Sequence, residues 1–153
     1  MNAITKHLPL IEKIFLAATL IGIILFALKI DTSVIKVALL GLAITFFLFS
    51  YRPNESPQPD ERFGFQGLLA HVIVPKILWI SSAISTLGIA FFLFNFGNGS
   101  YRRLLIIGGL TIAVACVILL ASLMQGVKYL AATTPLLLRA IPLLVLDFYL
   151  LFF

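Results

Sequence analysis

Five long apolar stretches, separated by short polar ones, make up most of this sequence. A helix that rises 1.5 Å per residue needs about 20 apolar residues to cross ~30 Å of hydrocarbon, and each stretch is close to that length. The composition agrees, because 61% of the 153 residues are hydrophobic and only 11% are charged. A soluble domain of this size cannot bury so large an apolar share. The sequence therefore predicts a multi-pass integral membrane protein with helices at about 10–30, 34–51, 76–96, 103–128 and 131–153.

The polar segments between these stretches are too short to form a separate domain. Turns are expected at 31–33 and 95–100, where polar residues and glycines interrupt the apolar pattern. Only the segment 52–62 is a polar loop of any length, and its three prolines exclude a regular helix. We therefore expect a single all-α membrane domain over residues 1–153, built as a helix bundle from two hairpins and a final helix.

A short helix in the membrane interface is predicted at about 63–74, before the third membrane helix. The chain is apolar from 63 to 96, which would be ~50 Å as one helix and too long for a single crossing. Pro75 offers a break, and before it the apolar side chains lie on one helical arc while Gln66 and His71 lie opposite. This amphipathic pattern is typical of a helix lying in the interface plane.

Two charged residues, Arg139 and Asp147, lie within the last apolar stretch. A charge at the bilayer centre costs ~2.5–3.5 kcal/mol on insertion scales, so such residues are candidates for function. They are eight residues apart, ~12 Å along a helix and ~80° around it, which excludes a direct pair within one regular helix. Their partners must come from another helix, a second subunit or lipid. Together with Pro142, these charges leave two alternatives: five membrane helices, or four plus a re-entrant or broken C-terminal segment.

The third helix carries a ridge of small polar residues at helical spacing. Ser81, Ser82 and Ser85 share this ridge. It either lines a hydrated path together with Arg139 and Asp147, or lets neighbouring helices approach closely. These five residues are the candidate intramembrane polar site.

The basic residues predict orientation and lipid contacts. The eleven Lys and Arg residues are scattered at segment ends with no basic run, which argues against nucleic-acid binding. A cytoplasmic N-terminus places seven of them inside and four outside, as the positive-inside rule prefers. Arg102 and Arg103, at the start of the fourth helix, are expected to contact lipid phosphates. The predicted location is a cell membrane, with several crossings and a cytoplasmic N-terminus.

No residue pattern predicts catalysis, a metal or a cofactor. The single cysteine, Cys116, forms no intrachain disulfide, and the two histidines, His7 and His71, lack metal-ligand spacing. His71, beside the break at Pro75, is a possible pH-sensitive group. The serines of the third helix have no acid or base within their own segment. We therefore expect a non-enzymatic protein.

Two functions are compatible with this architecture. The first is a small membrane component that acts through helix association, as a homo-oligomer or as a subunit of a larger membrane complex. Its basis is that Arg139 and Asp147 need partners, which another chain could supply. The second is a small transporter or channel in which Arg139, Asp147, Ser81 and Ser85 face a polar cavity.

Overall fold

The computed structural model describes residues 2–30, 32–52, 69–96, 99–124 and 134–152. Within these residues the chain forms helices and no strands, which confirms the predicted all-α bundle. The elements are α1 (Asn2–Ala27), α2 (Ser33–Phe49), the π-helical turn η1 (Leu69–Ile73), α4 (Val74–Phe94), α5 (Ser100–Met124) and α6 (Thr134–Phe152).

Four segments in the described part of the chain are long and apolar enough to cross a membrane. α6 is not among them: it is a continuous helix of 19 residues with Pro142 inside, ~28 Å long at 1.5 Å per residue. The protein is thus a multi-pass helix bundle to which a fifth, C-terminal helix is added. The four candidate spans are His7–Ala27, Ser33–Ser50, Val74–Phe94 and Ser100–Ser122.

The first helix begins earlier than its apolar run. α1 starts at Asn2 rather than near residue 10, so the charged residues Glu12 and Lys13 lie well inside the helix. The polar loop predicted at 52–62 lies outside the described residues except for Arg52. The interfacial helix predicted at 63–74 is described only from Leu69 onward, where η1 leads directly into α4.

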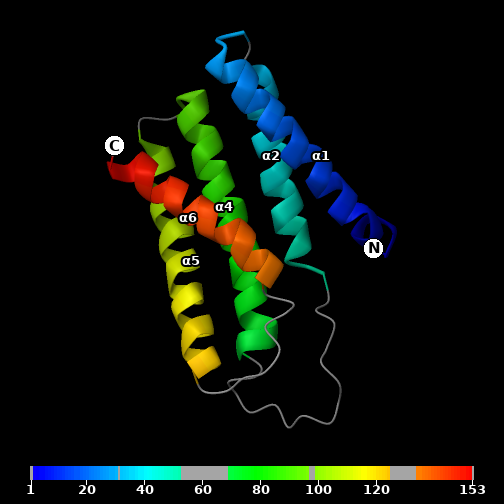
Figure 1. Ribbon diagram of the computed structural model, residues 1–153, viewed down its shortest axis with the longest axis vertical. Coiled ribbons are helices and arrows are strands. Elements are labelled where there is room, and N and C mark those ends of the chain that lie inside the picture. The colour runs from blue at the N-terminus through cyan, green and yellow to red at the C-terminus, as the bar shows by residue number, and fades with distance from the viewer. Residues whose placement is uncertain (1, 31, 53–68, 97–98, 125–133, 153) are drawn as a thin grey trace.

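Two antiparallel hairpins form the body of the bundle. α1 packs against α2, α4 packs against α5, and the hairpins meet where α2 contacts α4 (Figure 1). Glycines allow the helices to approach closely: a Cβ atom at Gly22 of α1 would lie 2.7 Å from the Cα atom of Ile35 on α2. On α5, a Cβ atom at Gly108 would lie 2.8 Å from the backbone nitrogen of Ser85 on α4. Small residues thus set both hairpin interfaces.

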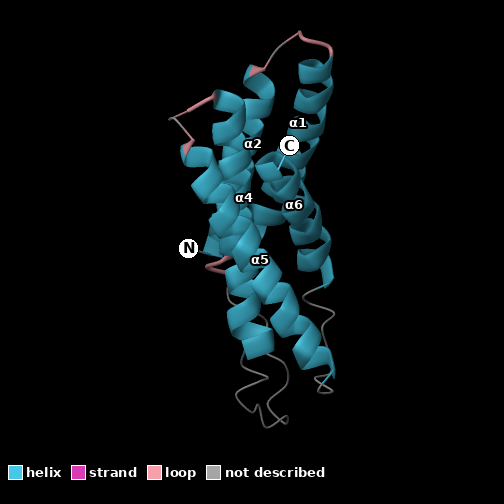
Figure 2. Ribbon diagram, turned by 90° about the vertical axis from the view of Figure 1, so that its left-hand side faces the viewer, coloured by secondary structure: helices cyan, strands magenta, loops and turns pink. Residues whose placement is uncertain are grey.

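The C-terminal helix lies obliquely across the second hairpin. α6 packs against both α4 and α5, and Figures 1 and 2 show it crossing them instead of running alongside. Its core-facing side is a stripe at spacings of four, three and four residues, the period expected of one helix face. This stripe consists of Leu136, Ala140, Leu143 and Asp147.

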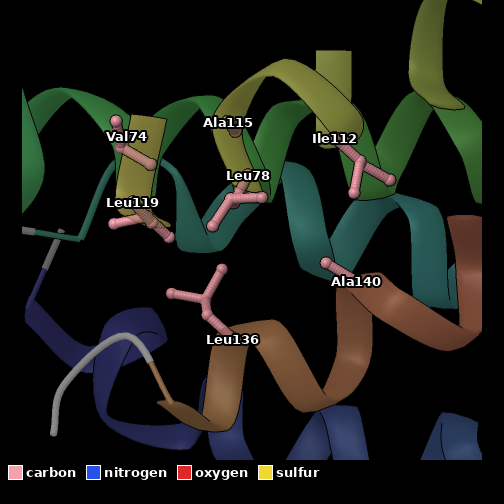
Figure 3. Close-up of a cluster of buried hydrophobic side chains, with 7 residues drawn as sticks. All are labelled: Val74, Leu78, Ile112, Ala115, Leu119, Leu136 and Ala140. Carbon is pink, nitrogen blue, oxygen red and sulfur yellow. The ribbon is translucent and has the colours of Figure 1, made fainter. Parts of the chain in front are cut away.

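An apolar cluster anchors the first half of α6. Leu136 and Ala140 pack there against side chains of α4 and α5, and Figure 3 shows the group gathered between the three helices. Leu143 packs against this cluster and against two others that include residues of α2. Asp147 is therefore the one carboxylate on a helix face that is otherwise apolar. The buried members are Val74, Leu78, Ile112, Ala115, Leu119, Leu136 and Ala140.

Candidate functional site

A buried carboxyl contacts a buried hydroxyl at the junction of α6 and α4. Both oxygens of Asp147 lie within hydrogen-bond distance of the Ser85 hydroxyl oxygen, at 2.7 Å for Oδ1 and 2.6 Å for Oδ2. Each of the two residues has 0% of its surface exposed. The sequence separation is 62 residues, so the pair is a product of the tertiary fold. Two of the predicted site residues, Ser85 and Asp147, are thus brought together.

Two glycines of α5 make room for this contact. A Cβ atom at Gly109 would lie 3.3 Å from Oδ2 of Asp147, so the glycine forms the wall against which the carboxyl packs. Its neighbour Gly108 lets the backbone of Ser85 come close to α5. The carboxyl is therefore enclosed by α4, α5 and its own helix. In the described part of the chain, the Ser85 hydroxyl is its hydrogen-bond partner and no basic side chain is paired with it.

An ion pair joins the start of α6 to α1. The Nε atom of Arg139 pairs with Oε1 of Glu12, and Nη2 donates a hydrogen bond of 3.1 Å to Oε2. One hydrogen bond and one close charge contact thus join the two side chains, while Oε1 accepts no hydrogen bond from the described residues. Glu12 is almost completely buried, with 3% of its side chain exposed, whereas the Arg139 side chain is 34% exposed.

Trp79 of α4 contacts the arginine of this ion pair. The Arg139 guanidinium lies 5.6 Å from the centre of the indole ring, within the range of a cation–π contact. The indole in turn stacks on Phe49 of α2, with the ring centres 4.4 Å apart. Arg139 therefore links three helices: its own, α1 through Glu12 and α4 through Trp79.

These contacts change the interpretation of the two charged residues. Arg139 and Asp147 do not pair with each other, as the helical spacing predicted. Their partners lie on other helices of the same chain, so a second subunit is not needed to satisfy either group. The prediction of association with another chain was based on these two residues lacking partners, and that reason no longer applies.

The serine ridge of α4 does not act as one unit. The Ser81 hydroxyl donates to backbone carbonyls of its own helix, at 2.8 Å to Ile77 and 3.1 Å to Leu78. The Ser82 hydroxyl is buried and has no hydrogen-bond partner among the described residues. Only Ser85 reaches across to α6. Ser85 thus joins two helices, Ser81 is hydrogen-bonded within its own helix, and Ser82 is buried without a described partner.

Three other predicted residues are not part of this site as described: Arg102, Arg103 and His71. Arg102 and Arg103 are exposed at the start of α5, where lipid contact stays a prediction. His71 lies in η1, and its side chain is outside the described part of the structure.

Glu12 is a site residue that the sequence reasoning missed. The predicted helix at 10–30 placed it near the water, where a charge needs no partner. A usable signal was present, because Glu12 and Asp147 are the only two acidic residues within the apolar stretches, and one of the stretches also contains Arg139.

Comparisons with protein-family models, curated proteins and solved structures find no match to this chain.

Proposed function

We propose that the protein is a small, non-enzymatic membrane transporter in which Asp147 and Ser85 form the binding site of a cation that moves down the membrane potential. The observation that carries this proposal is a carboxyl on the core-facing stripe of α6 whose hydrogen-bond partner is a hydroxyl. A carboxyl inside a membrane bundle is costly to keep, and in transporters and pumps such groups bind the ion that moves. A purely structural helix contact does not require an ionisable group at this position.

The alternative function, helix association, has less support from the geometry. Arg139 and Asp147 were its main reason, and both have partners within the chain. The outward faces of α1 and α5 are apolar, which suits contact with lipid chains as well as contact with another helix. Self-association and assembly with another membrane protein stay predictions, as do headgroup contacts of Arg102 and Arg103 and a cytoplasmic N-terminus in a cell membrane.

The proposal is tested by ion flux into vesicles that contain the full chain. The protein is reconstituted in phosphatidylethanolamine and phosphatidylglycerol, and valinomycin with a potassium gradient imposes a potential that is negative inside. An entrapped pH dye follows protons, and radioactive sodium follows Na⁺. We expect one of these cations to enter faster than in protein-free vesicles, and Asp147→Asn to reduce entry to the protein-free rate.

A matched control separates loss of the site from loss of an intramembrane hydroxyl. Thr111 of α5 donates its hydroxyl to the Ile107 carbonyl of its own helix, at 2.6 Å, and makes no hydrogen bond to Ser85 or Asp147 in the described structure. Thr111→Val should therefore transport like the wild type. If the wild-type protein carries neither cation above the protein-free rate, transport is refuted. The mass of the detergent-solubilised protein would then test association directly.

A further inference from the structure

We infer that the species bound at the Asp147–Ser85 site is a proton rather than a metal cation. This inference rests on the proposed function and states which cation the proposed site binds. We assign the carboxyl at this site its neutral, protonated form, hydrogen-bonded to the Ser85 hydroxyl. Three observations support it: the hydrogen-bond count at the pair, the number of oxygen ligands available and the groups that surround the carboxyl.

The hydrogen-bond count favours a neutral carboxyl. An ionised carboxylate only accepts hydrogen bonds, and a serine hydroxyl has a single hydrogen to donate. Since both Asp147 oxygens lie within 2.7 Å of the Ser85 oxygen, one hydrogen would have to serve two charged oxygens in a buried site. A protonated carboxyl fits better, because its O–H donates to the serine oxygen while the serine O–H donates to the other carboxyl oxygen. Both donors are then satisfied, as buried polar groups require.

The Asp147–Ser85 pair by itself supplies fewer oxygens than a hard metal cation takes. Hard cations such as Ca²⁺ and Mg²⁺ take six or more oxygen ligands, and the pair supplies two carboxyl oxygens and one hydroxyl. Gly109 lies against the carboxyl. A Cβ atom added there would lie only 3.3 Å from Oδ2, so this side of the carboxyl is already closely packed. A proton needs only one donor and one acceptor, and the geometry supplies both.

No described cation replaces the proton as the partner of Asp147. The charged groups described on the elements packed around this part of α6 make no hydrogen bond or ion pair with Asp147. Arg139 is bound to Glu12, and Lys36 of α2 lies over the Phe94 ring. The remaining titratable or basic groups on these elements are Lys76 on α4, Tyr101, Arg102, Arg103 and Cys116 on α5, and Tyr149 on α6 itself; none has a hydrogen bond or ion pair to Asp147 in the described structure.

Ser82 offers a second hydroxyl along the same helix face. Residues three apart are neighbours on a helix surface, so Ser82 lies on α4 between Trp79, which contacts Arg139, and Ser85, which contacts Asp147. Its hydroxyl oxygen is buried and has no hydrogen-bond partner within the described part of the chain. This places a second hydroxyl next to Ser85 along α4, on the side toward Trp79, where it can accept a proton that leaves the pair.

Infrared spectroscopy tests the protonation state independently of transport. The full chain in lipid is compared with Asp147→Asn, because the asparagine amide can donate to Ser85 and accept from it as a protonated carboxyl does. We expect the wild-type minus variant difference at neutral pH to contain the carbonyl band of a protonated carboxyl. This band should be lost reversibly as the pH is raised, and added Na⁺ should leave it unchanged. The two proteins should unfold at the same temperature at neutral pH.

The outcomes separate this inference from the proposed function. A carboxylate band in place of the protonated band, or a protonated band that Na⁺ removes, would overturn the inference even if the vesicles transport sodium. A protonated band in a protein that carries no protons would leave the inference standing and refute transport. Proton entry that Asp147→Asn abolishes, together with the protonated band, supports both.

Discussion

The Glu12–Arg139 ion pair should respond asymmetrically to removal of its two partners. Replacing Arg139 by Met leaves the Glu12 carboxylate in place with 3% of its side chain exposed. Removing one partner of a buried ion pair costs ~3–5 kcal/mol, because the remaining charge is uncompensated. This pair is not fully buried, since 34% of the Arg139 side chain is exposed, and exposed pairs contribute only ~0–1 kcal/mol. We therefore expect Arg139→Met to lower the free energy of unfolding by about 2 kcal/mol, between these limits.

The reverse change should cost less. Glu12→Gln leaves Arg139 charged, but this long side chain is already partly exposed and can turn its guanidinium toward the membrane surface. Its contact with Trp79 persists, so we expect a loss of about 1 kcal/mol or less. The double variant should be no less stable than Arg139→Met alone, because neither buried charge then remains.

Unfolding by sodium dodecyl sulfate in mixed micelles measures these differences. Trp79 is the only tryptophan in the chain and lies against Arg139 and Phe49, so its fluorescence reports on the same region. Equal losses for the two single variants, or losses that add in the double variant, would refute the reasoning. The first result would mean that Glu12 is not buried as described, and the second that the two side chains do not interact.

Three further changes test the packing and the surface. Gly108→Ala should destabilise the α4–α5 hairpin, because the new Cβ atom would lie 2.8 Å from the backbone nitrogen of Ser85; the unfolding free energy measures it. Gly99→Ala has open space but a φ of +89°, so we expect a loss of about 1 kcal/mol from backbone strain alone, and an unchanged stability would contradict it. Replacing Arg102 and Arg103 by Gln should reduce the number of phosphatidylglycerol molecules retained in native mass spectrometry, with no change in unfolding.

Much of the fold follows from the lengths of the apolar runs. An apolar run near 20 residues has few alternatives to a membrane helix, because backbone groups in hydrocarbon must be hydrogen-bonded internally. The start of α1 was harder to predict, since its first turns have ordinary polar composition and can be helical at or beyond the membrane surface. Because the predicted helix began later than α1 does, the burial of Glu12 inside the bundle was not predicted.

The candidate site could be predicted only in part. The spacing of Leu136, Ala140, Leu143 and Asp147 defines one face of a helix, so the sequence alone indicates that Asp147 faces the core. The same spacing shows that Arg139 lies off this face. Which residue meets each charge is not encoded locally, because Ser85 is 62 residues from Asp147 and Glu12 is 127 residues from Arg139. Such contacts depend on how the hairpins pack.

Two contacts with α4 fix the position of α6 along the bundle. Arg139 and Asp147 are ~12 Å apart along α6, while the α4 residues that they contact, Trp79 and Ser85, are six residues or ~9 Å apart along α4. The unequal spacings are compatible with the oblique crossing of α6 over α4 that Figure 1 shows. A shift of α6 by one helical turn would break both contacts at once, so the ion pair to Glu12 holds Asp147 in register with Ser85.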